Sequence, residues 1–322
     1  MPLTPAPLPL EALRSAFGAR LKLNVPLSRY TTAHVGGPAE AFLVANNRDE
    51  LAETVQQLWA LGAPFRVFGS GSNMLVSDAG LAGVAVINRA AHVEFVTGEA
   101  AGAPYVLAES GANLGGVARK AALHGLSGME WAATIPGTVG GAVYGNAGAH
   151  GGNVQGSLSL AEILHPQYGR QTWSCDQLEY QYRSSNLKRL HIPAVILSAQ
   201  IRLAHSTTQD VKARMEANAA HRRHSQPPGA SLGSMFKNPP GDYAGRLIEA
   251  AGLKGTRMGR VEISPVHANF FVAGEDATAG DVWSLIQMVR QTVEEKFGVA
   301  LELEIECVGR WNEADTASGK SH

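Results

Sequence analysis

The stretch that decides the fold lies in the middle of the chain, where residues 135–149 read IPGTVGGAVYGNAGA. Small residues dominate it, yet Ile135, Val139 and Tyr144 are interleaved with the glycines. A solvated linker has no need of such apolar side chains, so a low-complexity linker is the weaker of two interpretations. We interpret residues 128–156 as a buried loop whose backbone lies flat against an extended ligand.

A second glycine-rich loop follows a predicted strand, where residues 69–73 read GSGSN. Its glycines and small hydroxyl residues would let backbone N–H groups converge on a phosphate. Taken alone, the loop could equally be a structural turn, because Met74 stands where the last glycine of a G-x-G-x-x-G fingerprint would be and no P-loop is present. The two loops together indicate a large dinucleotide held by backbone rather than by charge, with Thr134, Thr138 and Asn146 able to hydrogen-bond it.

The composition narrows the class of protein. The 322 residues include 27 Lys+Arg and 28 Asp+Glu, a balance that argues against a basic nucleic-acid binder, and the 45% of hydrophobic residues suffice for a sizeable core. Cys175 and Cys307 lie in unrelated segments, so they make neither a disulfide framework nor a four-thiolate zinc site, and a reducing cytosol is the expected compartment. Residues 1–10 lack the charged start of a signal peptide, and without a run of about 20 apolar residues no membrane span is expected.

Hydrophobic periodicity predicts many short helices and strands, as in an α/β or α+β protein. The expected helices cover residues 11–23, 48–61, 114–123, 208–223, 243–251 and 278–297. The expected strands cover residues 64–68, 84–87, 105–112, 194–203, 267–272 and 299–307. The last helix has the clearest boundaries, because Thr278 and Asp281 form a capping-box pattern and Gly298 supplies the stop. The strand after it alternates strictly as far as Cys307.

Six motifs occur in order along the chain. They are TTAHVGGPAE at 31–40, GSGSN at 69–73, the glycine-rich stretch 135–151, YRSS at 182–185, GSMFKNP at 233–239 and LELE at 301–304. In this order they resemble the UDP-N-acetylenolpyruvoylglucosamine reductase family, over about residues 20–311. Between Tyr182 and Tyr243 the chain has no tyrosine and little spare length, so it resembles the class without an extra tyrosine-bearing loop.

The resemblance implies an α+β architecture, with a vanillyl-alcohol-oxidase/PCMH-type FAD-binding fold in two subdomains plus a C-terminal α/β substrate domain. The expected parts are an N-terminal arm and short helix at 1–20, FAD-binding subdomain 1 at 21–88, FAD-binding subdomain 2 at 89–205, a C-terminal substrate-binding domain at 206–311 and a polar tail at 312–322.

The activity that the resemblance implies is reduction of UDP-N-acetylglucosamine enolpyruvate to UDP-N-acetylmuramate, in the cytoplasmic synthesis of bacterial peptidoglycan precursors. FAD is the expected cofactor and NADPH the expected reductant. We expect a monomer with no metal and with neither nucleic-acid nor membrane partners. Two alternatives stay open: a noncovalent FAD-dependent oxidase of a sugar or alcohol on the same fold, and a nucleotide-binding module without activity.

Three residues match catalytic positions of the family. Hydride addition to an alkene conjugated to a carboxylate builds negative charge on that carboxylate, and Arg183 is the permanently charged candidate to stabilise it. Ser234 matches the proton donor, and Glu304 matches a carboxylate that assists at the substrate. Without the resemblance, Arg183 is a surface arginine, Ser234 is a turn residue and Glu304 is one of three solvated glutamates on a strand.

The other expected site residues lie in or beside these motifs. Those expected to bind FAD all belong to the two glycine-rich loops: Gly69, Ser70, Gly71, Ser72, Asn73, Thr134, Ile135, Pro136, Gly137, Thr138, Gly141, Ala142, Asn146, Gly148 and Ala149. Those expected to bind substrate are Tyr182, Lys237, Asn238 and His267, although a satisfied structural histidine is the alternative for His267.

Two further features stand apart from the expected site. His221 and His224 lie three residues apart on a predicted helix but lack a third metal ligand, so a solvated basic face, or part of the approach of the diphosphate, is the better interpretation. Departures from the family pattern occur at Asn186-Leu187 and Ala273-Gly274, and they concern packing and kinetics rather than the reaction.

Overall fold

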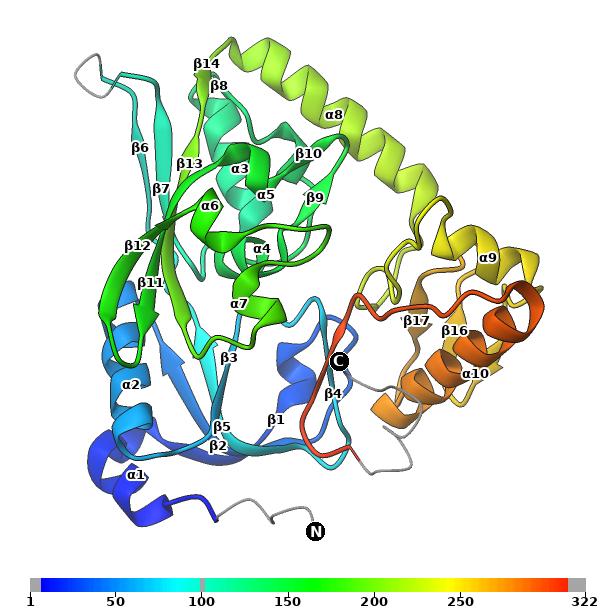
Figure 1. Cartoon of the computed structure of the whole chain (residues 1–322), viewed down its shortest axis with the longest axis horizontal. Coiled ribbons are helices and arrows are strands. Elements are labelled where there is room, and N and C mark those ends of the chain that lie inside the picture. The colour runs from blue at the N-terminus through cyan, green and yellow to red at the C-terminus, as the bar shows by residue number, and fades with distance from the viewer. Residues whose placement is uncertain (1–6, 99–101, 312–322) are drawn as a thin grey trace. The chain divides into compact units, whose positions relative to one another are not determined.

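The computed structural model describes residues 7–98 and 102–311 (Figure 1). The chain forms two compact units, each assembled from separate segments. Among the described residues, unit 1 comprises 7–21, 43–69, 86–98 and 102–222, and unit 2 comprises 22–42, 70–85 and 223–311. These units differ from the five parts expected from the sequence, because the region 21–88 contributes to both of them. The tail expected at 312–322 lies outside the described residues, as does most of the N-terminal arm.

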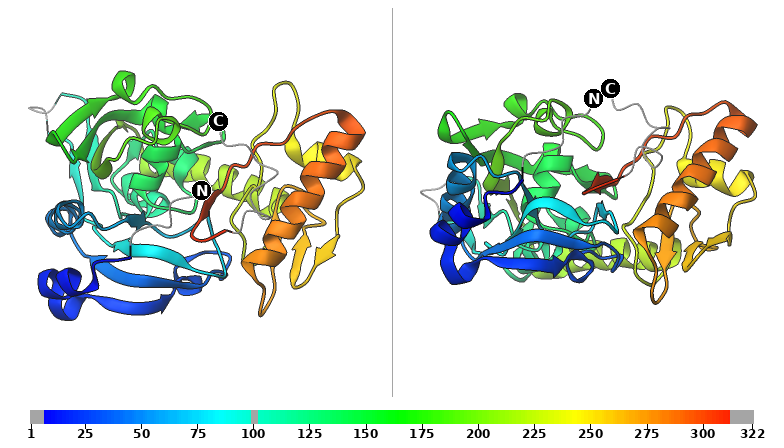
Figure 2. Two further views of the ribbon diagram at one scale, coloured as in Figure 1. Left: turned by 60° about the horizontal axis from the view of Figure 1, so that its bottom comes forward. Right: turned by 90° about the horizontal axis from the view of Figure 1, so that it is seen from below.

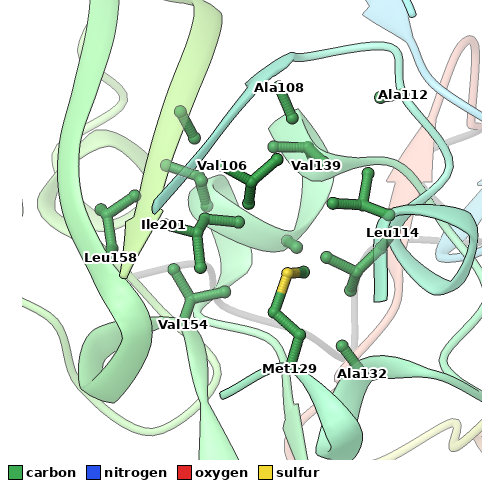
Figure 3. Close-up of a cluster of buried hydrophobic side chains, with 14 of the residues drawn as sticks. Val106, Ala108, Ala112, Leu114, Met129, Ala132, Val139, Val154, Leu158 and Ile201 are labelled. Atoms are coloured by element: carbon green, nitrogen blue, oxygen red, sulfur yellow. The ribbon is translucent and has the colours of Figure 1, made fainter. Parts of the chain in front are cut away.

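Unit 1 is built on an antiparallel sheet of five strands in the order β12-β11-β13-β7-β6. The strands are β6 (Val93–Val96), β7 (Tyr105–Glu109), β11 (Leu158–His165), β12 (Gly169–Ser174) and β13 (Val195–Arg202). Alternate residues of β7, Val106 and Ala108, are fully buried, as period-2 geometry requires when one face of the sheet covers a core. They pack with apolar side chains of helices α3 (Leu114–Leu123) and α4 (Val139–Gly145), including Leu114 and Val139 (Figure 3).

The rest of unit 1 consists of short elements and two longer helices. These are α1 (Leu10–Phe17), η1 (Gly18–Arg20), α2 (Arg48–Ala60), β8 (Leu126–Ser127), η4 (Glu130–Ala132), β9 (Gly148–Ala149), β10 (Gly152–Asn153), α5 (Val154–Ser157), α6 (Cys175–Leu178), α7 (Asn186–Arg189), β14 (Ala204–His205) and most of α8 (Thr208–Ser225). Asn47 caps α2 by accepting a hydrogen bond from the Glu50 N–H at 2.8 Å.

Unit 2 contains a three-stranded antiparallel sheet, β15 (Arg257–Met258), β16 (Val261–Ile263) and β17 (Phe271–Ala273), with helices α9 (Ala244–Ala250) and α10 (Ala279–Phe297) beside it (Figure 2). The capping box predicted for α10 is confirmed, since Thr278 and Asp281 exchange hydrogen bonds and Gly298 ends the helix at φ +65°. Both carboxylate oxygens of Asp78 also accept hydrogen bonds from the first turn of α10.

Two further sheets include strands of unit 2. Strand β18 (Glu306–Val308) pairs in parallel with β4 (Met74–Val76) in unit 2. A four-stranded sheet has the order β1-β2-β5-β3, formed by β1 (Lys22–Pro26), β2 (Pro38–Ala45), β5 (Leu81–Asn88) and β3 (Phe65–Phe68), with η2 (Leu27–Tyr30) between β1 and β2. Strands β2 and β5 each continue from one unit into the other.

Several predicted elements need correction. The helix expected at 11–23 ends at Phe17, where Gly18 takes φ +50°. The strand expected at 267–272 is limited to Phe271–Ala273, because a turn precedes it in which Phe270 N–H donates to His267 C=O. The strand expected at 299–307 is limited to Glu306–Val308, and its alternation breaks, leaving Cys307 exposed rather than buried.

The segment 128–156, expected to be one loop, instead holds five short elements from η4 to α5. None of the helices in the described part of the chain combines the length and apolar character needed to cross a membrane.

Candidate functional site

The loop 69–73 joins β3 to β4, and glycine is required at its centre. Gly71 has φ +61°, and a Cβ atom there would lie 2.0 Å from the Tyr30 carbonyl oxygen. Within residues 7–98 and 102–311, the backbone N–H groups of Ser70, Gly71 and Ser72 donate to no acceptor. These three donors are therefore available to an acceptor from outside the protein, and their predicted contact with a phosphate stays a prediction.

The second glycine-rich stretch touches the start of the first. A Cβ atom on Gly69 would lie 2.5 Å from Thr138 Oγ1, so only glycine allows this approach. Thr138 caps α4, and the N–H groups of Val139 and Gly140 donate to the carbonyls of Ala112 and Ser110, at 2.9 and 2.8 Å. The N–H groups of Val139 and Gly140, neither of which was expected to bind FAD, thus have acceptors within the protein.

The hydroxyl of Thr134 differs from the groups just described in its hydrogen bonding. Its Oγ1 is buried and, among the residues that the structure describes, has no hydrogen-bond partner. A buried hydroxyl without a partner is costly, so this atom fits a site completed by a bound molecule. Neither residues 69–73 nor residues 134–149 include an acidic side chain. The unbonded donors and the absence of carboxylates in the two stretches fit an anionic dinucleotide such as FAD.

Arg183 lies in a tight turn of unit 1. The backbones of Gln181 and Ser184 exchange two hydrogen bonds, 3.0 and 3.1 Å long, and Arg183 between them has φ +55°. A side-chain-bearing residue other than Asn or Asp seldom adopts this left-handed conformation, and such outliers gather at functional sites. The guanidinium carbon of Arg183 lies 5.3 Å from the ring centroid of Tyr182, which is itself 53% exposed.

Ser234 belongs to a short extended segment in unit 2 that has a neighbour on each side. On one side, Met235 N–H donates to Asn269 C=O at 2.8 Å. On the other side, Glu304 N–H donates to Met235 C=O at 2.9 Å. The tertiary structure therefore brings the segments carrying Ser234 and Glu304 together, although about 70 residues separate them in the sequence.

Asn269 holds this segment through its side chain as well. Its Oδ1 accepts the Phe236 N–H at 2.9 Å, and its Nδ2 donates to the Phe236 carbonyl at 2.8 Å. Asn269 is only 3% exposed, so its amide acts like the backbone of a neighbouring strand inside the core. Sequence analysis missed Asn269, since a single asparagine between Ala268 and Phe270 gives no signal of such a partner.

The geometry separates Glu304 from the glutamate two residues earlier. Glu302 has a side chain that is 75% exposed and pairs with Lys237 Nζ at 3.0 Å. Glu304 is partly buried, and its carbonyl accepts a hydrogen bond from Asn73 Nδ2 at 3.0 Å. The Asn73 carbonyl in turn accepts the Glu306 N–H at 2.8 Å. Asn73, expected to contact FAD, thus links its glycine loop to the Glu304 segment within unit 2.

Three other expected contacts have partners inside the protein. Asn146 Nδ2 donates to the Gln181 carbonyl at 3.0 Å. Asn238 Oδ1 accepts the Ala244 N–H at the start of α9, at 3.1 Å. His267 Nδ1 accepts the Asn269 N–H at 3.2 Å, as expected of a structural histidine, and burial together with the charge of nearby Lys254 lowers its pKa. Ligand contacts by these three residues stay predictions.

One of the two α8 histidines lies beside a histidine from another segment. His221 lies with its ring centroid 5.7 Å from that of His150, and burial lowers the pKa of His150, with further contributions from His221 and Arg222. Over the described ranges, no group of three His, Cys, Asp or Glu side chains is arranged to hold a metal ion.

Comparisons with known proteins agree with this geometry. Residues 39–161 match a model of an FAD binding domain, and residues 224–308 match the C-terminal domain of UDP-N-acetylenolpyruvoylglucosamine reductase. The enzyme of that name from Chloroflexus aggregans is 42% identical over 305 residues, covering 92% of this chain and all of the relative. Its counterpart from Chloroflexus aurantiacus is 40% identical, covering 88% of this chain and 96% of the relative.

A solved structure supports the same assignment. The crystal structure of the reductase from Thermus caldophilus aligns with a TM-score of 0.74 and 34% identity, covering 90% of this chain and 99% of that one. The α+β, FAD-binding fold predicted from the sequence is thereby confirmed. The chain belongs to the UDP-N-acetylenolpyruvoylglucosamine reductase family.

Proposed function

We propose that this chain reduces the enolpyruvyl ether of UDP-N-acetylglucosamine enolpyruvate to the lactyl ether of UDP-N-acetylmuramate, using NADPH and FAD, in peptidoglycan precursor synthesis. The observation that carries the proposal is the match to reductases of this name over about nine-tenths of the chain, which includes both the FAD-binding and the C-terminal regions. An oxidase on the same fold is less supported, because the C-terminal match is to a reductase domain.

The residues present suit FAD. The N–H groups of Ser70, Gly71 and Ser72 would hold its anionic or carbonyl oxygens. The Thr134 hydroxyl would find in it the partner that it lacks among the described residues. When bound, FAD accepts hydride from NADPH and delivers it to the substrate alkene.

Arg183 would act on the substrate carboxylate. As hydride adds to the methylene carbon, negative charge moves onto that carboxylate, and a fixed guanidinium lowers the energy of this state by about 3 kcal/mol. The fork of an arginine fits both carboxylate oxygens, which a lysine cannot match. The φ +55° turn fixes where the Arg183 side chain starts, so little reorganisation is needed as the charge develops.

Ser234 would supply the proton that completes the reduction, from its Oγ to the carbon next to the carboxylate. A serine hydroxyl is a weak acid, so it must be held close to the developing carbanion. The backbone bonds of Met235 with Asn269 and Glu304 restrict the segment next to Ser234. The proton that Ser234 gives up must be replaced, and the carboxyl of Glu304, whose backbone N–H bonds to Met235, is the group proposed to supply it.

Several finer statements complete the proposal. The near balance of 27 basic and 28 acidic residues supports a small-molecule enzyme without a nucleic-acid partner. We further propose a monomer that acts in the cytoplasm without attachment to a membrane.

An anaerobic absorbance experiment tests the proposal. NADPH added to the FAD-loaded protein should bleach the flavin band near about 450 nm, and the enolpyruvyl sugar nucleotide should then restore it. Ser234→Ala should be bleached normally but recover more slowly. If the sugar nucleotide fails to restore the band in the unchanged protein, the proposed substrate is wrong.

A further inference from the structure

The turn that carries Arg183 is fastened to the C-terminal end of α4 by two side chains. Asn146 Nδ2 donates to the Gln181 carbonyl at 3.0 Å, on one side of the turn. Ser185 Oγ donates to the Tyr144 carbonyl at 2.7 Å, on the other side. These bonds join segments about 40 residues apart, and all of them lie within unit 1.

The buried side-chain amide of Asn146 makes two hydrogen bonds. It is 5% exposed, and its Oδ1 accepts the Gln155 N–H at 3.1 Å while its Nδ2 donates to Gln181. Its backbone has φ +47° at the end of α4, a conformation that asparagine tolerates better than most residues. The amide therefore bridges the α4 end to the Gln181 turn, and it needs both a donor and an acceptor to do so.

The backbone strain at Arg183 explains why the turn needs to be attached to α4. Arg183 is held at φ +55°, which costs about 1 kcal/mol or more for a residue of its type. Such a conformation persists only where surrounding bonds fix it. The two bonds between Gln181 and Ser184 close the turn, and the side chains of Asn146 and Ser185 attach it to the end of α4.

We propose that Asn146 is a positioning residue for Arg183: its amide fixes the Gln181–Ser184 turn so that the Arg183 guanidinium is preset for the substrate carboxylate. The proposal rests on the proposed function for the role of Arg183. It assigns Asn146 an action through Arg183, in addition to the FAD contact predicted for it from the sequence.

The main variant is Asn146→Gly, because glycine tolerates the left-handed backbone at the end of α4 while the substitution removes the side chain together with its amide. Asn47→Ala is the matched control, since it also deletes an asparagine hydrogen bond to backbone, at the start of α2. Reoxidation of the reduced flavin by the enolpyruvyl sugar nucleotide should slow about tenfold to a hundredfold in Asn146→Gly and stay within about twofold in Asn47→Ala.

A double-mutant cycle separates positioning from general damage. In an Arg183→Ala background, Asn146→Gly should slow reoxidation by less than about twofold, because the group that it positions is gone. An equal slowing with and without Arg183 would overturn the proposal. So would the absence of any slowing in the single variant.

Amide hydrogen exchange gives a readout that does not depend on the substrate. Exchange of the peptide covering 181–185 should speed up in Asn146→Gly, and exchange of the peptide covering α2 should not change. Unchanged exchange at 181–185 would also overturn the proposal. Failure of the proposed function would appear separately, as a lack of reoxidation in the unchanged protein.

Discussion

Asn269 offers the sharpest test of how the Ser234 segment is held. Substitution by alanine removes both side-chain bonds to Phe236, at 2.9 and 2.8 Å. Phe236 is fully buried, so water cannot replace the lost partners of its N–H and C=O groups. Each buried backbone group left without a partner costs about 1 to 3 kcal/mol. We therefore expect Asn269→Ala to lower the free energy of unfolding by about 3 kcal/mol.

The measurement is urea unfolding of the FAD-loaded protein, followed by circular dichroism. Asn47→Ala is the control, because it removes one exposed capping bond and should cost only about 1 kcal/mol. The difference of about 2 kcal/mol between the two variants is outside the usual error of such measurements. If Asn269→Ala costs no more than Asn47→Ala, the side-chain pairing with Phe236 is not what holds this segment.

Asn269→Asp tests the same pairing with Phe236 through the pH dependence of the variant's stability. The aspartate keeps the shape of the side chain, but its ionised form replaces the Nδ2 donor with an acceptor facing the Phe236 carbonyl. Burial in the folded state raises the pKa of such a carboxyl above its unfolded value. The variant should therefore gain stability relative to the unchanged protein as the pH falls toward about 4, because protonation restores a donor. A stability difference that does not vary with pH would refute this reasoning.

Three other substitutions test separate features. Gly71→Ala should abolish FAD retention, because its Cβ would lie 2.0 Å from the Tyr30 carbonyl oxygen. Gly62→Ala, where φ is also positive but no atom lies within 4 Å of the added Cβ, should retain FAD. The absorbance of bound flavin distinguishes the two variants. Glu304→Gln should slow flavin reoxidation about tenfold or more, whereas Glu302→Gln, which removes an exposed ion pair, should change it less than twofold. Equal effects of the two variants in stopped-flow absorbance would contradict the catalytic role proposed for Glu304. The pKa of His267 is lowered in the folded state, so the stability that His267 contributes is present above its unfolded pKa of about 6.5 and is lost as the pH falls through the folded pKa. His267→Gln should therefore reduce the loss of unfolding free energy below about pH 6.5. Urea unfolding at several pH values measures this loss.

Local patterns in the sequence were enough where the relevant interactions are local. Helix α10 begins after Thr278 and ends before Gly298 as predicted, because the capping box and the left-handed stop are formed by residues a few positions apart. The five-stranded sheet was harder to predict: strands β7 and β13 were predicted, but β6, β11 and β12 were missed. The case of β11 has a structural reason. Its pairing with β13 shifts register after Leu158 and again after Glu162, so its residues do not alternate regularly between faces.

The ordered motifs determined from the sequence alone that this is a flavin-dependent reductase, and they identified Arg183, Ser234 and Glu304 as the residues to examine. Only the tertiary structure decided what holds these residues. Asn73, Asn146 and Asn269 bond to the backbone of Glu304, Gln181 and Phe236, each more than thirty residues away. Almost every residue has the same backbone N–H and C=O groups, so the sequence of side chains does not indicate which distant backbone group an asparagine will bond to.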